Sequence, residues 1–262
     1  MKKLLFQGIT LLSLFFICWF SLAQIQWTNI FELEKSGKEL EEKLGEQLWE
    51  MYSQEGREVL NDTIVQSLDS IIHTICQANK IDEESIKLHV LEKDEINAYA
   101  LPNGHLVINT GLIKAVDRQE ELTGVIGHEI AHIELNHVMK KLAKEVGISM
   151  LISISTGNNN GLSEVAKSLS SSAFDRSQEQ TADIKAAEYL SKANVSPEHL
   201  ANFLYKMSLD TPEFLTYFTW INTHPDSQER AEKILNFQEK NLVVNKPILS
   251  KKSWDEIKNL VQ

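Results

Sequence analysis

The sequence predicts an α+β fold that is mainly helical and carries a small β-sheet. Long stretches on both sides of the centre repeat their apolar residues with the period of an α-helix. Between them, residues 85–111 alternate apolar and polar side chains as β-strands do. The chain has 262 residues, of which 42% are hydrophobic and 24% charged, enough for a buried core. We therefore expect one compact domain over residues 24–262, preceded by a separate N-terminal segment.

The first predicted elements are helices, followed by strands. Residues 30–79 have helical periodicity, and Gly56 and Asn61 should divide them into two or three helices. The stretch "SIKLHVLE" then alternates like a strand. "INAYALPNGHLVINTG" contains two further strands around a turn at residues 102–104, Pro-Asn-Gly.

The second half of the chain is predicted to be helical. Asp117 and Glu120 have the spacing of a capping box, so a long helix is expected from there to about Glu145. "VGISMLISIS" is apolar but too short to span a membrane, and "STGNNNGLS" has the composition of a flexible loop. Helices resume in "SEVAKSLSSSAFDRSQEQTADIKAAEYLSKA" and "SPEHLANFLYKMS". Two short C-terminal helices are predicted by further capping boxes, which pair Asp226 with Glu229 and Ser253 with Glu256.

Residues 1–23 have the pattern of a signal peptide. Two lysines precede an apolar run over residues 4–20, and the small side chains of Ser21 and Ala23 predict cleavage after Ala23. The apolar run is also at the short end of what spans a bilayer, so an uncleaved N-terminal anchor facing the periplasm is the alternative. We expect export to the bacterial periplasm, with any membrane association peripheral or through the N-terminus.

Composition argues against a nucleic-acid partner and against a disulfide. The formal net charge is -11, and Lys and Arg do not cluster along the body of the chain. After cleavage Cys76 would be the only cysteine, so no intramolecular disulfide could form. Cys76 occupies an apolar-periodic position on a predicted helix and is expected to be a core residue.

The stretch "GHEIAHIELNH", residues 127–137, carries the clearest chemistry. On a helix, His128 and His132 lie roughly 40° apart and one turn along the axis, so two imidazoles can share one metal ion. Glu129 lies roughly 60° from His132, near enough to reach a water on that metal. His137 is nine residues beyond His128, which places it on the opposite face of the helix. We therefore do not expect His137 to be a ligand.

This spacing is the H-E-x-x-H arrangement, in which two histidines bind zinc and the glutamate acts as general base. The alternative is a polar face on a surface helix. The apolar neighbours Val125, Ile126, Ile130 and Ile133 argue against a solvated face. A catalytic zinc also needs a third protein ligand and an open fourth position.

The best candidate for the third ligand is Glu179, in "FDRSQEQTADIKAAEYL". Glu179 and Asp183 are four residues apart on one predicted helical face, with the small Ala182 beside them. One carboxylate could bind the metal while the second accepts a hydrogen bond from a ligand histidine. Taken alone, E-x-x-x-D is more often a solvated face, so the residues by themselves leave this choice open.

Four ordered blocks resemble the HtpX and CAAX-prenyl-endopeptidase family of zinc metallopeptidases, in the gluzincin group. "NAYALPNGHLVINTGLI" is similar to the family's strand segment, and "EELTGVIGHEIAHIELNH" to its active-site helix. "RSQEQTAD" is similar to its Arg-x-x-Glu-x-x-Ala-Asp segment, and "INTHPDSQER" to its Thr-His-Pro…Arg segment. The resemblance implies a zincin-like metallopeptidase domain whose small β-sheet lies beside the active-site helix.

The resemblance also implies one zinc ion per chain and a role for individual residues. The implied set comprises the zinc ligands His128, His132 and Glu179, the general base Glu129, the helper carboxylate Asp183, the transition-state residue His224, and Asn97 and Ala98 on a substrate-side edge strand. Arg230 is a candidate partner of a site carboxylate. Without the resemblance, His224 would be a loop histidine before a proline, and Arg230 a surface charge.

The expected function is a zinc-dependent endopeptidase that acts on unfolded or misassembled exported proteins, as in protein quality control. The sequence lacks the family's membrane-spanning hairpins and helical-repeat domain, so it resembles a small exported member. Its partner would be a polypeptide substrate, cleaved preferentially at apolar residues. The alternative is a latent or non-proteolytic zinc-containing chaperone or assembly factor on the same scaffold. The intact Glu129 favours the enzyme, because a structural zinc site needs no base. Substrate identity and oligomeric state stay open.

Overall fold

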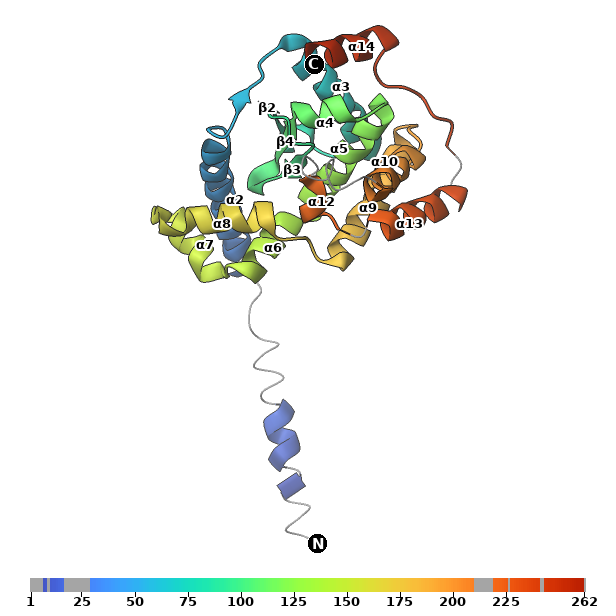
Figure 1. The fold of residues 1–262 in the computed structure, drawn as a ribbon. Coiled ribbons are helices and arrows are strands. Elements are labelled where there is room, and N and C mark those ends of the chain that lie inside the picture. The colour runs from blue at the N-terminus through green and yellow to red at the C-terminus, as the bar shows by residue number, and fades with distance from the viewer. Residues whose placement is uncertain are drawn as a thin grey trace. The chain divides into compact units, whose positions relative to one another are not determined.

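The computed structural model describes residues 7–8, 10–16, 29–209, 219–225, 227–240 and 243–261. The chain forms two compact units, Met1–Glu39 and Leu40–Gln262, and Figure 1 follows its elements from the N-terminus to the C-terminus. In the first unit, residues 10–16 are helical. None of the described helices is long and apolar enough to cross a membrane. The predicted cleavage point after Ala23 lies outside the described residues.

Four strands of the second unit form one mixed sheet, in the order β1-β2-β4-β3. The strands are β1 (Arg57–Glu58), β2 (Lys87–Glu92), β3 (Ala98–Ala100) and β4 (His105–Asn109). β2 and β4 run parallel, whereas β1 is antiparallel to β2 and β3 is antiparallel to β4. Three of these strands are predicted by the sequence. The two-residue β1 is not, because so short a stretch becomes a strand only through its partner.

The predicted turn between β3 and β4 is present. Residues Pro102–Gly104 form a short 3-10 turn, in which Asn103 and Gly104 have positive φ angles of 62° and 73°. Gly104 cannot carry a side chain, because a Cβ there would lie 1.8 Å from the backbone oxygen of Ser85. The turn therefore packs directly against the segment that leads into β2.

Helices make up most of the described chain, as predicted (Figure 1). They are α2 (Asn29–Tyr52), α3 (Asp62–Asn79), α4 (Thr110–Ala115), α5 (Gln119–Glu134), α6 (His137–Glu145), α7 (Ile148–Ser155), α8 (Leu162–Ser171), α9 (Arg176–Lys192), α10 (Glu198–Leu209), α12 (Trp220–Thr223), α13 (Ser227–Lys240) and α14 (Lys251–Leu260). α5 packs against β3, α9 and α10. Its residues 121–132 are all buried, so this helix is the central element of the unit.

The predicted single helix from Asp117 to Glu145 is wrong in its length. The chain forms two helices there, α5 and α6, because it turns at Leu135 and Asn136. Asn136 has a φ of 52°, in the left-handed region that asparagine tolerates better than most residues. This break changes the direction of the chain just after the H-E-x-x-H residues.

The capping box predicted at the start of α5 is also wrong. The N-cap residue is Arg118, which makes no side-chain capping bond. The Asp117 N–H instead donates to Glu121 Oε2 at 2.8 Å, so Glu121 and not Glu120 satisfies the backbone at this end. The acidic first turn still lies where negative charge stabilises a helix.

The C-terminal helices are present, with one shifted cap. α14 begins after Ser250, whose hydroxyl accepts the Ser253 N–H at 3.1 Å, so the predicted box of Ser253 with Glu256 is wrong by one turn. Asp226, predicted to cap the preceding helix, lies outside the described residues. Cys76 is buried in α3 as predicted.

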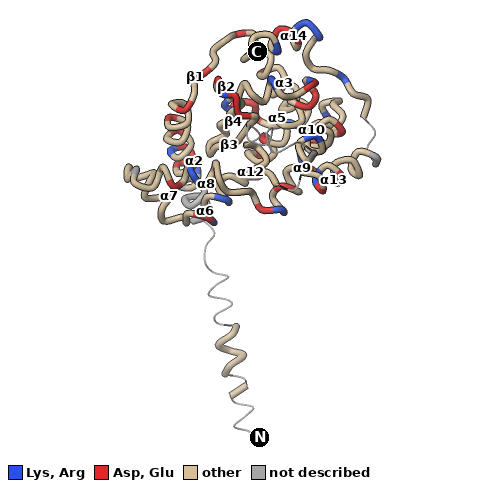
Figure 2. Tube along the Cα trace, in the orientation of Figure 1, with Lys and Arg blue, Asp and Glu red and all other residues tan. Residues whose placement is uncertain are grey.

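Acidic and basic residues are interspersed along the helices and loops of the second unit (Figure 2), and most of their side chains are exposed or half-buried. The buried exceptions include Glu129, Glu179, Asp183 and Arg230, each 4% exposed or less. Buried charges are costly unless they are paired or bind a metal. This group therefore marks the candidate site, where α5, α9 and α13 meet.

Candidate active site

α5 places His128, Glu129 and His132 in the interior. All three residues are fully buried. The Nε2 atoms of the two histidines are 3.0 Å apart, and their ring planes meet at 71°. The spacing of four residues on one helix therefore brings the two imidazoles together, as predicted.

Two further donors come from distant parts of the chain. Glu179 on α9 places Oε1 3.2 Å from His132 Nε2 and Oε2 3.7 Å from His128 Nε2. His224 follows α12 and places Nδ1 3.3 Å from His128 Nε2 and 3.0 Å from Glu179 Oε1. The structure thus brings the expected third ligand to the two histidines and adds His224 facing the same point.

The geometry and chemistry of these four residues fit one zinc ion. One ligand atom from each of His128, His132, Glu179 and His224 lies within 4.8 Å of all the others. Tetrahedral zinc with bonds of about 2.0–2.2 Å separates its ligand atoms by about 3.4 Å, close to the spacing seen here. Imidazole and carboxylate are both preferred zinc ligands.

Electrostatics keep the donors in the protonation states that a metal requires. Burial lowers the pKa of His132 well below its ordinary value, which favours neutral imidazole. Burial alone would raise the pKa of Glu179, but His224 and Arg230 more than offset this and hold the pKa well below its ordinary value. Metal ligands must be neutral imidazole and ionised carboxylate, so the site is prepared for a cation.

Arg230 and Asp183 contact the zinc-site residues Glu179 and His128. The Arg230 guanidinium donates from Nε and Nη2 to the two Asp183 oxygens, at 2.7 and 2.8 Å. Its Nη1 also lies 2.5 Å from Glu179 Oε2. Asp183 Oδ1 lies 3.1 Å from His128 Nδ1, the nitrogen on the far side of that ring. Despite burial, which acts to raise it, the pKa of Asp183 is lowered to about 2 by Arg230.

His137 is not on the far side of the helix, and the sequence-based expectation is wrong here. Because the chain turns at Asn136, His137 returns to the site and places Nδ1 3.2 Å from His132 Nδ1. His137 is buried, and its Nε2 lies 3.4 Å from Thr181 Oγ1. It is therefore a neighbour of a ligand histidine, although it does not join the four donors. The one available signal was the asparagine at 136, a residue type that often ends helices.

Trp220 is the second residue that sequence analysis missed. Its Nε1–H donates to Glu129 Oε1 at 2.9 Å, and its ring stacks on His224 with centroids 4.3 Å apart. Glu129 Oε2 is buried and has no hydrogen-bond partner among the described residues. One oxygen of Glu129 is thus fixed and the other is free to act. No helical or strand spacing links residue 220 to residue 129, so only the fold reveals this pair.

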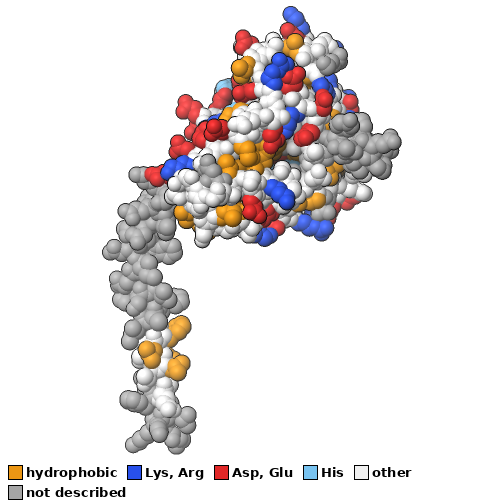
Figure 3. Space-filling model, turned by 60° about the vertical axis from the view of Figure 1, so that its left-hand side comes forward, with side chains coloured by type: hydrophobic (Ala, Val, Ile, Leu, Met, Phe, Trp, Pro, Cys, Tyr) orange, Lys and Arg blue, Asp and Glu red, His pale blue; other side chains and the backbone are white. Residues whose placement is uncertain are grey.

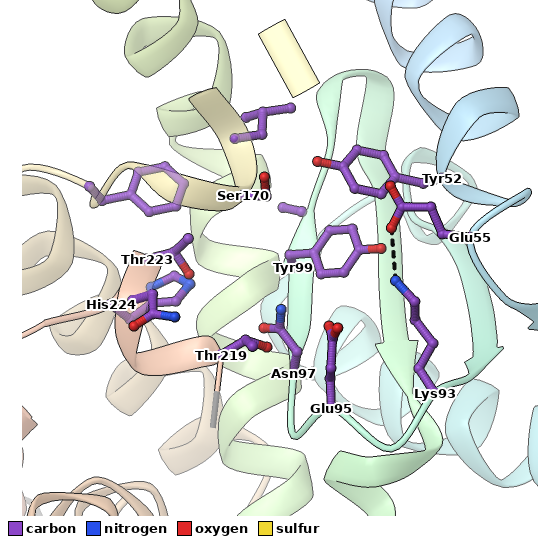
Figure 4. A pocket seen from close by; sticks show the side chains of 14 residues that line it. Tyr52, Glu55, Lys93, Glu95, Asn97, Tyr99, Ser170, Thr219, Thr223 and His224 are labelled. Atoms are coloured by element: carbon purple, nitrogen blue, oxygen red, sulfur yellow. Dashed lines mark hydrogen bonds and ion pairs between the residues drawn. The ribbon is translucent and has the colours of Figure 1, made fainter. Parts of the chain in front are cut away.

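The sheet edge beside the site carries Asn97 and Ala98. Asn97 lines a cavity of about 240 Å³ together with His224 (Figure 4). The carbonyl of Asn97 accepts the Asn109 N–H, and the Leu101 N–H donates to the His105 carbonyl. Bonding residues alternate along an antiparallel pair, so the backbone groups of Ala98 point away from β4. Ala98 itself has no exposed surface.

The family follows from comparison with known proteins. The model described as Peptidase family M48 matches residues 65–238, which include strands β2, β3 and β4, the helices α5 and α9, and His224. The chain belongs to peptidase family M48. In this family the buried group of three histidines and one glutamate is the site of a single zinc ion.

Several individual relatives are similar to this M48 protein. It is 26% identical over 267 residues to "Metalloendopeptidase OMA1, mitochondrial" of Bos taurus, covering 89% of this chain and 49% of that protein. It is 28% identical over 183 residues to "Metalloprotease LoiP" of Escherichia coli K12, covering 66% and 70%. With "Metalloprotease YcaL" of the same organism it shares 27% over 165 residues, covering 60% and 63%. The chain thus spans about half the length of the bovine relative.

Proposed function

We propose that this protein is a zinc-dependent endopeptidase that hydrolyses peptide bonds in unfolded or misassembled exported proteins. The arrangement of Glu129 carries the proposal. Its Oε1 is held by Trp220, while its Oε2 has no hydrogen-bond partner among the described residues, next to a zinc site and a cavity. A structural zinc site has no use for such a carboxylate. The relatives named as metalloproteases add support.

The residues divide the reaction between them. Zinc, when bound, supplies a Lewis acid and lowers the pKa of water from 15.7 to about 7. Glu129 Oε2 accepts a proton from the attacking water and returns it to the leaving nitrogen. Trp220 keeps Oε1 occupied, so the proton moves at Oε2. Asp183 and Arg230 hold His128 and Glu179 in position.

We infer that His224 stabilises the transition state. A catalytic zinc keeps its fourth position open, so His224 Nδ1 must leave the donor group before hydrolysis. The imidazole can then donate a hydrogen bond to the oxygen on which negative charge develops. Its Nε2 lies 3.5 Å from Glu129 Oε1, which keeps the ring beside the base.

A second function is favoured by the same residue. With His224 as fourth donor the site is closed, as structural zinc sites are. The full burial of Ala98 also covers the sheet edge at that position. Both observations suit a latent or non-proteolytic zinc-containing chaperone or assembly factor.

We infer that the substrate peptide binds along the outer edge of β3, the side that does not pair with β4. An extended peptide can add to a sheet edge by backbone pairing, which selects weakly among side chains and suits unfolded substrates. Because Ala98 has no exposed surface, this edge must open before a peptide can pair with it. The backbone N–H of Ala98 faces this edge. Ala98→Pro should remove the donor without breaking the β3–β4 ladder, and hydrolysis should fall while zinc stays bound.

We infer that residues 1–23 are a signal peptide that directs export. The alternative is a membrane anchor through residues 4–20 that is retained. Figure 3 shows apolar side chains on the described part of this segment. These residues include Leu11, Leu12, Leu14, Phe15 and Phe16, each between 58% and 75% exposed. Such a surface suits recognition by an export apparatus or a bilayer.

The test is proteolysis of one protein in its folded form and in a permanently unfolded form. The purified protein should cleave only the unfolded form, and a chelator should stop cleavage. Wild type and Ala98→Pro are compared side by side, with zinc content and thermal unfolding as controls for the fold. Equal cleavage of both forms, or full activity in Ala98→Pro, would show that the edge of β3 does not bind the substrate. A zinc-loaded wild type that cleaves neither form would favour the second function.

A further inference from the structure

The cavity beside His224 extends away from the zinc site along the sheet. It has a volume of about 240 Å³, smaller than the roughly 300–1,000 Å³ of typical ligand pockets. Figure 4 shows Tyr52, Glu55, Lys93 and Glu95 on the side of the cavity away from His224, with the Tyr99 hydroxyl directed towards that side. The space therefore suits one side chain of a peptide held on β3, rather than a whole small-molecule ligand.

The charges at the far end of this cavity do not balance. Lys93 and Glu55 form an ion pair at 2.8 Å. Glu95 lines the same cavity, is half-buried, and has no ion pair or hydrogen bond with any described residue. One lysine and two glutamates leave a formal charge of -1. The unpaired charge belongs to Glu95.

A buried hydroxyl lies close to this carboxylate. The Tyr99 OH is inaccessible to solvent and has no hydrogen-bond partner among the described residues. The Tyr52 OH, by contrast, donates to the Ala166 carbonyl at 3.0 Å. Figure 4 shows the hydroxyl of Tyr99 and the carboxylate of Glu95 directed into the same end of the cavity. A buried polar group without a partner is destabilising, so this end is prepared for a polar group from outside.

The walls between this end and the zinc site are mixed, with apolar side chains beside polar ones such as Asn97, Ser170 and Thr223. Leu169 and Phe174 line the cavity, and the rings of Tyr52 and Tyr99 lie 5.3 Å apart at its far end. An aliphatic stem would pack between these groups, and a charged head would reach Glu95. Lys and Arg side chains have this construction, an apolar stem with a charged tip.

We propose that this cavity is a specificity subsite that takes a lysine or arginine side chain of the substrate, next to the scissile bond. The inference rests on the proposed peptidase function and replaces the expected apolar preference at one position. The cation pairs with Glu95 and donates to the Tyr99 hydroxyl oxygen. An acidic side chain would face Glu95, while Lys93 is already paired with Glu55. An apolar side chain would desolvate Glu95 and leave the Tyr99 hydroxyl without a partner.

The first test compares peptides that differ only at one residue beside the scissile bond: Lys, Arg, Met or Glu. Mass spectrometry identifies the cleaved bond. We expect kcat/KM to be about tenfold higher for Lys and Arg than for Met, and lowest for Glu. Glu95→Gln should remove this preference, because kcat/KM for the Lys and Arg peptides should fall towards the value for the Met peptide. Asp94→Asn is the matched control, because Asp94 is exposed, pairs with Lys114 and does not line the cavity. The same preference in Glu95→Gln as in wild type would overturn the proposal.

A second measurement separates this inference from the proposed function. Zinc-loaded Glu129→Gln, which should not hydrolyse, is titrated with fluorescent forms of the Lys, Met and Glu peptides. Tighter binding of the Lys peptide, lost on adding Glu95→Gln, would support the subsite even if wild type cleaved nothing. Equal binding of all three peptides would overturn the subsite, even if wild type cleaved them all.

Discussion

The described chain holds two groups of histidines, and only one of them fits a metal. The first group is His128, His132 and His224, with Glu179. The second is His89 on β2 and His105 on β4, whose facing nitrogens Nε2 and Nδ1 are 2.9 Å apart. Both groups are largely buried, and each contains imidazoles in direct contact. Proximity of histidines alone therefore does not identify a metal site.

The two groups differ in where their lone pairs point. In the first, the ring of His128 meets those of His132 and His224 at 71° and 76°, so one nitrogen from each ring faces a common point. In the second, the rings of His89 and His105 are nearly parallel, at 13°, and Trp49 stacks on His89 at 3.6 Å. The two nitrogens that face each other share one hydrogen bond, so they offer no common point for a metal.

The carboxylates differ in the same way. Glu179 reaches the point that the first group shares. In the second group, Glu58 lies 3.3 Å from His89 Nδ1 and Glu46 lies 3.3 Å from His105 Nε2, at opposite ends of the pair. The second group is therefore a chain of contacts that joins β1, β2, β4 and α2. Convergence of donors on one point, rather than their number, distinguishes the zinc site.

The largest expected effect is loss of the metal. His132→Ala or Glu179→Ala should reduce zinc from one equivalent to a small fraction and abolish hydrolysis, because each change removes one of the three protein ligands that a catalytic zinc needs. His105→Gln should keep one equivalent. Zinc is measured in the purified proteins by elemental analysis, beside circular dichroism for the fold. Full zinc in Glu179→Ala would show that the third ligand is another residue.

The second prediction separates binding from catalysis within the first group. Glu129→Gln should keep one zinc and the wild-type fold, yet lose about 10²–10⁴-fold in hydrolysis, because an amide cannot accept the proton. The readout is kcat/KM on an unfolded polypeptide at matched zinc content. Hydrolysis at the wild-type rate would sink the mechanism.

The third prediction asks what the fourth donor does. His224→Ala should keep most of its zinc and lose about 10²–10³-fold in kcat, if His224 donates to the transition state. An increase in kcat would instead show that His224 holds the site in a latent, closed form. Thr223→Ala, a change at the adjacent residue, controls for disturbance of α12.

The fourth prediction concerns His137, which the fold returns to the site. His137→Ala should weaken zinc binding by about 10–100-fold, because the ring beside His132 Nδ1 orients that ligand. Glu134→Ala is the control, since Glu134 is exposed at the end of α5. Competition with a chromophoric chelator measures both affinities. Equal affinities in the two variants would mean that His137 does not act through His132.

These comparisons show what the sequence could and could not predict. The pairing of His128 with His132 follows from the geometry of one helix, so spacing alone predicts it. Glu179 and His224 come from other elements: spacing alone left Glu179 an open candidate, and only the resemblance to a family pointed to His224. His137 depends on one left-handed residue, Asn136, which spacing arguments treat as an ordinary helical position.

The second histidine group was missed for another reason. No helical or strand spacing links residue 89 to residue 105. In the structure they meet because β2 and β4 pair in parallel, with Lys87 opposite His105 and His89 opposite Val107. The register of parallel strands depends on the connection and the core, and a single sequence does not give it. Trp220 and Glu129 are likewise joined only by tertiary packing.

The smallest expected effect is a pH dependence of stability from the second group. Burial first, and then Lys87 and His89, lower the pKa of His105 from 6.5 to about 4, although Glu46 acts in the opposite direction. The unfolded chain therefore binds a proton at residue 105 that the folded chain does not, between about pH 6.5 and pH 4. The stabilisation is complete above pH 6.5 and is lost as the pH falls through this window.

His105→Gln should flatten this dependence, because glutamine does not titrate. The measurement is the difference in the free energy of unfolding between pH 7.5 and pH 5, from urea titrations in chelator, for wild type and variant. Chelator is present in both, so the titration of the zinc ligands cancels in the comparison. His73→Gln is the control, since the His73 side chain is 54% exposed and contacts only Glu83 among the described acidic groups within 4 Å. Two results would contradict this prediction: the same difference in His105→Gln as in wild type, or an equally reduced difference in His73→Gln. Either would show that protonation of the stacked pair does not change the free energy of unfolding. The two histidine groups would then differ in ligand geometry alone.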